Sequence, residues 1–430
     1  MTRIAFIGAG SVEFTRNLLG DILTFPELED AEIVLHDISA ERLATAEAMA
    51  RWTANEVGAH PAIESHVDRR RALDGADFAI NTIEVGGIAA TRLDFDIPRK
   101  YGLRQTIADT SGVGAVFRAL RTIPVLLSIA DDMMELCPQA WMLNYTNPMA
   151  MNCWAWYEGS LHQNVVGLCH SIQNTSHQVC EYAGVPFEEV AFLGAGVNHM
   201  SWVLRLERDG ESIYPLLDAA IAADPAGLGR HVRVQIYKLF GFFPTESSEH
   251  FAEYVPWFMR DDAEIERLRI PVDEYIRRSE ENLEIYAEEK RTLAAGEPFE
   301  LERSGEYASL IIHSMVTGEP RTIYGNVRNA GLITNLPEDA CVEVPCLVDR
   351  AGVQPTVVGE LPPQCAALDR TFLNVVELAV RGALEGRRDH VLQAVLLDPN
   401  AAGTLSVAQT GAMVDELLAA HAASLPDGLR

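Results

Sequence analysis

The chain opens on a short apolar strand that runs directly into a glycine turn, and this combination restricts the fold more than any other feature. Residues 3–7 (RIAFI) predict a buried strand, Gly8 a tight turn, and residues 12–25 a helix with an apolar side. A second strand over residues 31–38 completes a βαβ unit by Asp37. A helix that starts at such a turn exposes amide groups and the positive end of its dipole, which suits phosphate. The opening therefore predicts a sheet of parallel strands that binds a dinucleotide.

The segment GAGSVEF and the end of the second strand supply the candidate NAD-binding residues. Gly8 leaves the strand, Gly10 lies where the backbone has to approach a pyrophosphate, and Ser11 starts the helix. Asp37 would bind both ribose hydroxyls, and its charge would repel a 2′-phosphate, which favours NAD+ over NADP+. Glu13 replaces the third glycine of the fingerprint, which predicts looser helix packing. A plain glycine turn in an unrelated α/β protein is the alternative, but here strand, helix, second strand and acid follow in order.

The alternation of strands and helices continues through the first two hundred residues, as expected for a parallel sheet covered on both faces. Further strands are expected over residues 77–83, 141–146 and 165–170, and a helix over 116–136. Beyond Gly196 the pattern changes to mixed helices, extended segments within 321–358, and helices over 362–385 and 407–423. We therefore expect an α/β protein with a Rossmann-like, lactate/malate dehydrogenase-like domain over residues 1–195 and an α+β catalytic domain over residues 196–430.

Composition excludes several classes of partner. A chain of 430 residues with 48% hydrophobic and 22% charged residues is globular and large enough for two cores. Its formal net charge of −28 disfavours nucleic acid and anionic membrane surfaces as partners. Seven cysteines are an odd number and are few for a chain of this length, which argues against a disulfide framework and fits reduced thiols in the cytoplasm. Because the first ten residues form a strand and no later apolar run reaches eighteen residues, neither secretion nor membrane spanning is expected.

Cys169 and His199 are the candidate metal ligands. Cys169 ends a predicted strand in GLCHS, and His199 follows the strand-like run AFLGAGV, so two strand ends would present a thiolate and an imidazole to one ion. Two protein ligands are too few for a closed structural site, which favours an open catalytic site completed by substrate hydroxyls and water. The alternative is an inert buried cysteine beside a hydrogen-bonded histidine. A metal beside a nicotinamide would indicate chemistry beyond simple hydride transfer.

Two other segments carry candidate sugar-binding groups. Asn147 in NYTNP could contact sugar hydroxyls, or it could simply form an Asn-Pro turn. The run TESSEHFAEYVPWF brings Glu246, His250, Tyr254 and Trp257 into a short span. Charged runs are usually solvated faces, but aromatic residues among carboxylates are typical of a site for a polar ring.

These residues, in this order, resemble glycoside hydrolase family 4, the NAD- and metal-dependent glycosidases, and most closely its bacterial α-galactosidases (melibiases). The similarity covers nearly the whole chain. It is carried by the segments FIGAGS, QTIADT, RALRTIP, LNYTNPMAMN, GLCHS, NHMSW, TESSEHFAEY, PWF, YGNVRN, NLP, CVEV and QPT. His170 is itself informative, because family members acting on 6-phosphorylated sugars usually carry Asp or Asn there.

The resemblance implies a role for each candidate residue. Cys169 and His199 match the metal ligands, usually for Mn2+, and Gly8, Gly10, Ser11 and Asp37 match the NAD site. Asn147, Asp109 and His250 match substrate-binding positions, Tyr254 is the best match to the catalytic base, and His170 occupies the place of the group that assists leaving-group departure. The resemblance also implies a homodimer or homotetramer. Two segments depart from the family: its GPGG reads GVGA at residues 112–115, and Gly305 replaces the Arg of its SREYAS segment.

The implied reaction needs NAD+ without consuming it. NAD+ would oxidise carbon 3 of the sugar, the metal would stabilise an enediolate, and Tyr254 would remove the carbon 2 proton before the aglycone leaves and water adds. The family is an exception to the scheme of two catalytic carboxylates. The substrate is expected to be an α-galactoside, with α-glucosides and α-galacturonides as alternatives. An NAD-dependent polyol or hydroxy-acid dehydrogenase and an NAD-sensing binding protein are the rival functions.

Overall fold

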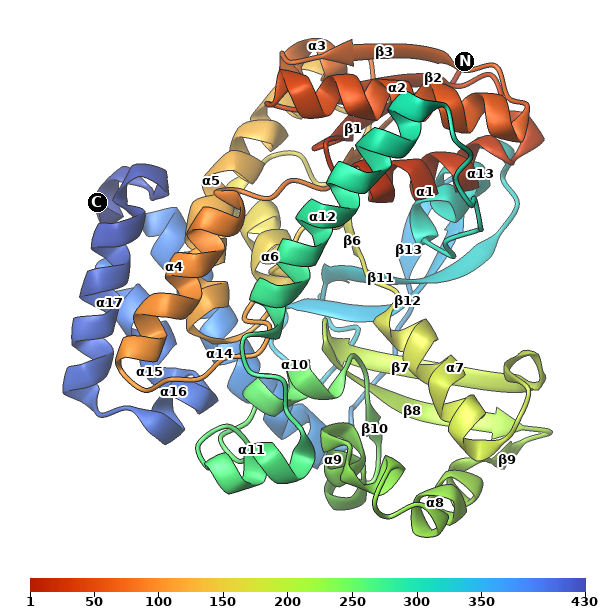
Figure 1. The fold of residues 1–430 in the computed structure, drawn as a ribbon. Helices are drawn as coiled ribbons and strands as arrows, with labels where there is room; N and C mark the ends of the chain where they lie inside the picture. Colours follow the sequence, from red (N-terminus) through yellow and green to blue (C-terminus); the bar gives the residue numbers. More distant parts are fainter.

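The computed structural model describes residues 1–430, and all its strands belong to one mixed, thirteen-stranded sheet (Figure 1). Six strands at one end of the sheet are parallel, in the order β3-β2-β1-β4-β5-β6. This is the strand order of a doubly wound dinucleotide-binding fold, so the predicted fold class is confirmed. The parallel strands are β1 (Arg3–Ile7), β2 (Glu32–His36), β3 (Ala62–His66), β4 (Phe78–Asn81), β5 (Trp141–Asn144) and β6 (Val165–Leu168).

The predicted strands start within one residue of the observed ones, and four of them end two residues too late. β1 has the predicted bounds, whereas β2, β4, β5 and β6 end at residues 36, 81, 144 and 168 instead of 38, 83, 146 and 170. In each of these four cases the last two residues leave the sheet at its carboxyl edge. Apolar or β-branched residues there look like strand in the sequence, but in the structure they line the edge where a doubly wound sheet binds its ligands.

The second half of the chain extends the same sheet with antiparallel strands. β11 pairs with β6, and the order continues through β12, β7, β8 and β10, with β13 on β12 and β9 on β8. The three extended segments predicted within residues 321–358 become β11, β12 and β13. The antiparallel strands are β7 (Val190–Val197), β8 (Met200–Arg208), β9 (Glu211–Ser212), β10 (Phe243–Pro244), β11 (Arg321–Arg328), β12 (Cys341–Asp349) and β13 (Gly352–Pro355).

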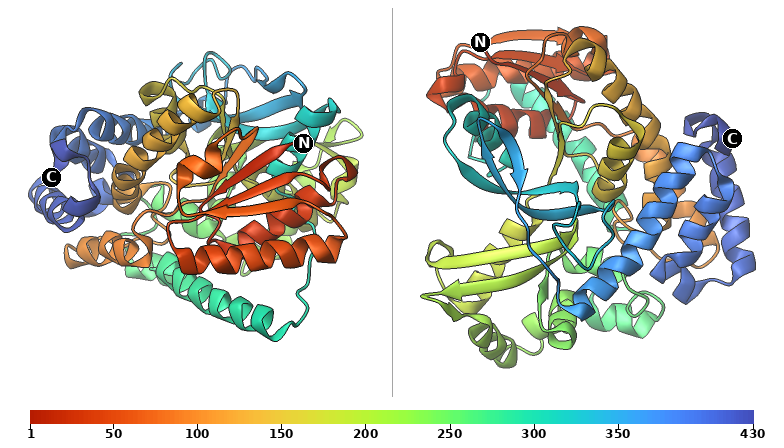
Figure 2. Two further views of the ribbon diagram at one scale, coloured as in Figure 1. Left: turned by 90° about the horizontal axis from the view of Figure 1, so that it is seen from above. Right: turned by 180° about the vertical axis from the view of Figure 1, so that it is seen from behind.

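Helices cover both faces of the parallel strands, and the last four pack against α4, α5 and α6 (Figures 1 and 2). The first nine are α1 (Val12–Leu23), α2 (Ala40–Val57), α3 (Arg69–Leu73), α4 (Gly87–Lys100), α5 (Gly112–Leu136), α6 (Met149–Gly159), α7 (Ser171–Ala183), α8 (Tyr214–Ala223) and α9 (Val232–Phe240). The others are α10 (Ser248–Glu253), α11 (Asp262–Leu268), α12 (Glu274–Ala295), α13 (Tyr307–Thr317), α14 (Pro363–Glu385), α15 (Arg388–Leu397), α16 (Pro399–Thr404) and α17 (Val407–His421).

Helix α5 contains an 18-residue window whose mean hydropathy is high enough for a membrane span, although polar residues interrupt its apolar run. Its most apolar window is 78% buried inside the protein, where it packs against α4, α6 and α14. Burial on several sides explains why this helix is apolar nearly all round. We therefore assign it to the core of the fold.

The two halves of the chain share one continuous hydrophobic core, which runs from β1 to α17. A second, smaller core lies between α7, the β7–β8 hairpin, α8 and α9. Strand β7 spans the expected domain boundary at residue 195, and α14, from the second half, packs on α5 and α6 of the first. The division into domains over residues 1–195 and 196–430 stays a prediction.

Helix α12 connects the two ends of the molecule. In Figure 1 it runs from the region of α10 and α11 to α1 and α2, and it contacts α1, α2 and α4. This helix lies in the second half of the chain but packs on helices of the first half. It is one wall of the dinucleotide cavity described below.

Candidate functional site

The glycine loop after β1 has the conformation that its residues predict. Gly8 adopts a positive φ of 93°, and a Cβ at this position would lie 2.9 Å from the backbone nitrogen of Ile83, after β4. Gly10 is needed for a different contact from the one expected. Its amide donates a hydrogen bond of 2.8 Å to Asp37, and a Cβ there would lie 2.4 Å from the same carboxylate. The loop therefore closes on Asp37 at the end of β2.

Ser11 precedes α1 as its N-cap residue, with no side-chain capping bond. Ser11, Gly8, Gly10 and Asp37 all line one cavity of about 1130 Å³ at the carboxyl edge of the parallel strands. Glu13 is exposed and also lines the cavity, so it does not separate α1 from the sheet. The opposite wall is α12, which contributes Tyr275, Arg278, Ser279, Asn282, Leu283, Ile285, Tyr286 and Glu289. The four predicted NAD-binding residues thus share one cavity.

The second group of predicted site residues lies beyond β5 and β6. The Sγ of Cys169, directly after β6, is 3.3 Å from Nε2 of His199, in the two-residue turn between β7 and β8. The two residues face each other across the junction of the parallel and antiparallel parts of the sheet. A tetrahedral divalent ion with ordinary bonds to sulfur and nitrogen would hold such atoms about 3.6 Å apart. The spacing matches two ligands of one ion.

The backbone and a threonine orient His199. The residue has a left-handed φ of 64°, and its Nδ1 lies 2.7 Å from Oγ1 of Thr110. Because that hydroxyl donates its own proton to Asp109 at 2.9 Å, it accepts from Nδ1–H of His199. This tautomer leaves the lone pair of Nε2 free on the side of Cys169.

Glu246 is a third donor beside this pair, although the sequence indicated it only as one of the candidate sugar-binding groups. Its Oε2 lies 3.4 Å from Nε2 of His199, and its Oε1 lies 3.6 Å from Nδ1 of His250. Glu246 has a left-handed φ of 67°, a conformation that costs a non-glycine residue roughly 1–2 kcal/mol. Burial would raise its pKa, but interaction with the neighbouring imidazoles of His199 and His250 lowers it. Cys169, His199 and Glu246 form a cluster with metal-ligating geometry.

The three predicted substrate-binding residues lie next to this cluster. Asn147, after β5, donates a hydrogen bond of 2.9 Å to Asp109, and Nε2 of His250 is 3.7 Å from the same carboxylate. Asp109, His199 and His250 form a second group of potential ligands. Burial opposes ionisation of Asp109, but the neighbouring imidazoles of His250 and His199 and the charge of Arg118 lower its pKa. Asn147 therefore lies beside this second group, its role in substrate binding stays a prediction, and its peptide bond to Pro148, which is cis, lies in the predicted Asn-Pro turn.

His170 points to a different partner. Its Nδ1 lies 3.0 Å from Oε1 of Glu306, and its side chain is half-exposed while that of Glu306 is buried. The hydrogen bond that His170 donates to Glu306 raises the pKa of His170 to about 9. The imidazole is therefore protonated at neutral pH and can donate a proton to a ligand. Gly305, before Glu306, has a φ of 73° with open space around it.

Tyr254, the predicted base, is fully buried at the end of α10. Its ring stacks against Phe372 at 6.1 Å and meets His250 edge-on at 6.3 Å. Burial, with the carboxylates of Asp109 and Glu253, raises its pKa well above the usual 10, and its hydroxyl has no hydrogen-bond partner of normal geometry. The position is within the site, but the phenolate needs a compensating cation.

Two buried carboxylates, Glu253 and Glu343, hydrogen-bond to segments that border the site. Glu253 accepts hydrogen bonds from the amides of Thr106, Ile107 and Ala108, and so fixes the segment that leads to Asp109. Burial raises its pKa to about 7, against the effect of these amides. Glu343 on β12 is equally buried, accepts a bond of 2.7 Å from Ser201, and has its pKa raised to about 7 by burial.

A buried arginine links the dinucleotide cavity with the second group of residues. Arg118 on α5 donates to the hydroxyl of Tyr275 at 2.8 Å and pairs with Glu84 at 3.5 Å, and both of these residues line the cavity. Its charge also lowers the pKa of Asp109.

Trp257, expected among the sugar-binding aromatics, is instead 43% exposed and stacks on Phe240 at 6.1 Å. The position of Trp257 therefore gives no support to that expectation.

Several residues that hold the site were missed. Thr110, Glu253, Glu306 and Arg118 act through hydrogen bonds or charge contacts with groups 34 to 157 positions away. Thr110 could have been noticed because it follows Asp109 in the segment QTIADT, and Glu306 because it follows Gly305, at which the family segment changes. Arg118 and Glu253 lie in the segments RALRTIP and TESSEHFAEY, which carry the family resemblance, but no local pattern indicates a role for either residue.

Comparison with known proteins agrees with this geometry. Residues 3–185 match the model for the family 4 glycosyl hydrolases, and residues 194–401 match that for the C-terminal domain of the same family. The alpha-galactosidase of Bacillus subtilis (strain 168) is 43% identical over 99% of this chain and 100% of its own length. That of Rhizobium meliloti (strain 1021) is 38% identical, covering 99% and 89%.

A solved structure also matches throughout. The 6-phospho-alpha-glucosidase from gut microorganisms, in complex with NAD and Mn2+, superposes with a TM-score of 0.83 and 20% identity over 99% of both chains. At that identity the superposition establishes the fold. The two family matches together cover most of the chain, and they agree with the resemblance of its sequence segments. The chain is therefore a glycoside hydrolase that belongs to glycosyl hydrolase family 4.

Proposed function

We propose that this enzyme hydrolyses α-galactosides and that it needs both NAD+ and a divalent cation, Mn2+, for the reaction. The observation that carries the proposal is the approach of Cys169 and His199 to 3.3 Å at the same sheet edge as the glycine loop. An ordinary lactate/malate dehydrogenase-like enzyme needs no thiolate and imidazole there. The 43% and 38% identical alpha-galactosidases support galactose as the sugar.

The residues present fit a bound cation. Burial and the nearby carboxylates of Glu343 and Glu246 raise the pKa of the Cys169 thiol to about 12, so only a bound cation would make the thiolate stable at neutral pH. The free lone pair of His199 and the carboxylate of Glu246 complete a set of sulfur, nitrogen and oxygen donors. Such a set suits a borderline divalent metal. Cys169 and His199 would hold the ion, with Glu246 next to it.

The residues present also fit a dinucleotide. The amide-rich turn at Gly8 and the N-terminus of α1 suit a pyrophosphate, and Asp37 suits ribose hydroxyls. When bound, NAD+ would accept a hydride from carbon 3 of the sugar and return it later, while the cation would act as a Lewis acid on the sugar oxygens. No net oxidation results, so the cofactor is required but is not consumed.

The protein's own side chains would position the sugar and move its protons. Asn147, Asp109 and His250 offer an amide, a carboxylate and an imidazole to sugar hydroxyls. Tyr254 would take the proton from carbon 2, because its ring borders the group of Asp109 and His250. His170, held protonated by Glu306, would donate a proton to the departing aglycone.

A panel of nitrophenyl glycosides tests the proposal. With NAD+, Mn2+ and reductant, the α-galactoside should be hydrolysed fastest, without accumulation of NADH, and a chelator should abolish the activity. α-Glucosides and α-galacturonides remain the alternative substrates. Stoichiometric NADH release from a polyol or hydroxy acid would instead make the protein a dehydrogenase. Full function after Cys169→Ala and His199→Ala would favour an NAD-sensing protein.

Deuterium at carbon 2 of the substrate tests the elimination route. Removal of that proton in a rate-limiting step gives a kinetic isotope effect, and no effect at carbon 2 or carbon 3 would contradict the route.

A cytoplasmic location and assembly into a homodimer or homotetramer stay predictions, as does the absence of nucleic-acid and membrane partners.

A further inference from the structure

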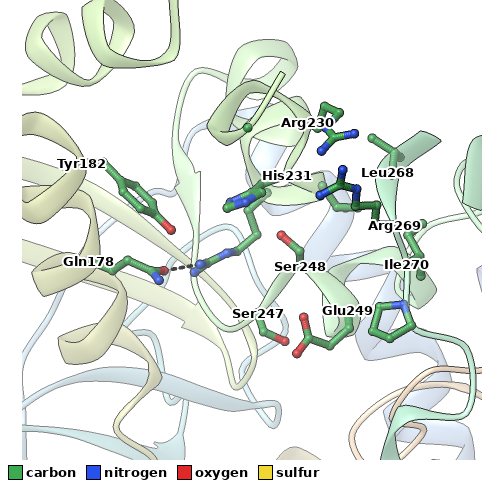
Figure 3. Close-up of a pocket in the computed structure, with 14 residues that line it drawn as sticks. Gln178, Tyr182, Arg230, His231, Ser247, Ser248, Glu249, Leu268, Arg269 and Ile270 are labelled. Carbon is green, nitrogen blue, oxygen red and sulfur yellow. Dashed lines mark hydrogen bonds between the residues drawn. The ribbon is translucent and has the colours of Figure 1, made fainter. Parts of the chain in front are cut away.

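A second cavity, of about 390 Å³, lies behind the segment that carries Glu246 and is separate from the dinucleotide cavity (Figure 3). Its walls come from α7, from the residues around the start of α9, from the segment Ser247–Glu249 and from the turn after α11. In Figure 3, Arg230 and Arg269 lie on one side, Gln178 and Tyr182 on the other, with Ser247–Glu249 between them. Its volume is in the range of small-molecule sites.

The cavity gathers positive charge in a strongly acidic protein. Arg230, Arg233 and Arg269 line it, together with His231, although the formal net charge of the chain is −28. None of the three arginines forms an ion pair with a carboxylate at 4.0 Å or less. The one carboxylate in the lining, Glu249, is paired with Arg278 on α12. The cavity therefore presents uncompensated guanidinium groups.

Arg233 is the strongest sign of a missing partner. Three arginines in the protein are buried: Arg121 pairs with Asp94 at 2.6 Å and Arg118 with Glu84 at 3.5 Å, but Arg233 has no carboxylate. Arg233 is 7% exposed, lies over the ring of Phe243 at 5.3 Å, hydrogen-bonds only to the neutral side chains of Thr175 and Gln178, and leaves its Nε without a partner. Burying an unpaired charge is costly, so buried charges in proteins are normally paired.

We propose that this cavity binds a small molecule through a tetrahedral oxyanion of the phosphate class, at a site distinct from both the sugar site and the dinucleotide site. Three guanidinium groups on two sides of the cavity suit an anion with three or more acceptor oxygens better than a planar carboxylate. The hydroxyls of Ser247, Ser248 and Tyr182 provide further donors. This site goes beyond the proposed function and does not depend on which sugar is hydrolysed.

The cavity borders two elements of the candidate active site. Ser247, in its lining, lies 2.8 Å from Nδ1 of His250 and follows Glu246 in sequence. Thr175 and Gln178, which hold Arg233, belong to α7, the helix that begins directly after His170. An anion bound here would therefore contact helix α7 and the segment Ser247–Glu249, and both of these elements follow directly on residues that lie near Cys169 and His199.

Titration calorimetry with sulfate tests the proposal without any sugar. Sulfate is a tetrahedral dianion that does not precipitate Mn2+, and saturation of the enzyme with NAD+ and Mn2+ blocks the dinucleotide site. We expect one saturable sulfate site per chain. Glycerol 3-phosphate should displace sulfate, whereas galactose should not. Displacement by acetate but not by glycerol 3-phosphate would overturn the phosphate assignment.

Four variants locate the site. Arg233→Gln and Arg269→Gln should each weaken sulfate binding about tenfold to a hundredfold, as expected for loss of a charged hydrogen bond. Arg269 is exposed, so its variant remains informative if Arg233→Gln does not fold. Arg71→Gln, at an exposed position on α3, is the matched control and should bind sulfate normally. Cys169→Ser should also bind it normally.

Three results would overturn the proposal: no saturable binding to the wild-type enzyme, equal weakening by Arg71→Gln and Arg269→Gln, or loss of binding in Cys169→Ser, which would place the anion at the metal pair. Because no substrate is used, an enzyme that fails to hydrolyse α-galactosides can still bind sulfate as expected, so the two proposals fail independently.

Discussion

Thr110→Val is expected to weaken metal binding without changing either proposed ligand. The substitution keeps the shape of the side chain but removes the hydroxyl that lies 2.7 Å from Nδ1 of His199. The ring then loses the bond that fixes its tautomer and directs Nε2 towards Cys169, 3.3 Å away. Removal of such a supporting partner typically reduces metal affinity 10- to 100-fold, or roughly 1.4–2.7 kcal/mol. His199 is only 6% exposed, so water replaces the lost hydroxyl poorly.

The affinity for Mn2+ can be measured by electron paramagnetic resonance of the free ion in titrations of NAD+-saturated enzyme. Activity of Thr110→Val should recover at high Mn2+, because the ligands remain. Thr53→Val is a matched control, since that buried hydroxyl bonds only to the carbonyl of Met49 within α2. Wild-type Mn2+ affinity in Thr110→Val, or equal weakening in both variants, would refute the orienting role of Thr110.

Three further outcomes are expected. Glu306→Gln replaces the carboxylate that raises the pKa of His170 to about 9 with a neutral amide, so the alkaline limb of the kcat/KM profile should move to lower pH; an unchanged limb would exclude His170 as the acid. Gly8→Ala would place a Cβ 2.9 Å from backbone atoms and should weaken NAD+ binding at least about tenfold. Gly58→Ala, also at positive φ but in open space, is the control: it should lower the free energy of unfolding by only about 1 kcal/mol and leave NAD+ affinity unchanged. Burial raises the pKa of Asp398 from 3.8 to about 7, so between about pH 4 and 7 the folded state retains a proton that the unfolded chain releases. The free energy of unfolding of the wild type should therefore fall by up to about 1.4 kcal/mol for each pH unit over this range. Urea unfolding should show a smaller fall in Asp398→Asn, and an equal dependence on pH in the two proteins would contradict this.

The parallel part of the fold could be predicted from the sequence because its signals are local. β1 and the glycine turn are adjacent residues, and the buried runs of β4, β5 and β6 have the continuous apolar character of strands covered on both faces. The sequence did not indicate that β11 would pair with β6 and continue the same sheet, because that pairing joins residues more than 150 positions apart. The path of α12 over the dinucleotide cavity was missed for the same reason.

The candidate site was partly predictable. Glycine, cysteine, histidine and asparagine at strand ends are unusual enough to notice singly, and the structure brings Asn147, Asp109, His250, Cys169 and His199 together. The supporting residues could not be found in this way. The role of Glu306 depends on a contact 136 positions away, and that of Glu246 on a left-handed backbone conformation that its own residue type disfavours.

The central claim is that Cys169 and His199 hold one divalent cation at the sheet edge that also binds the dinucleotide. Anomalous X-ray diffraction from crystals grown with Mn2+ and NAD+ tests it directly. The account predicts one strong anomalous peak about 2–2.5 Å from both Sγ of Cys169 and Nε2 of His199. A peak bound by Asp109 and His250 without the sulfur, or no peak near either ligand, would contradict it.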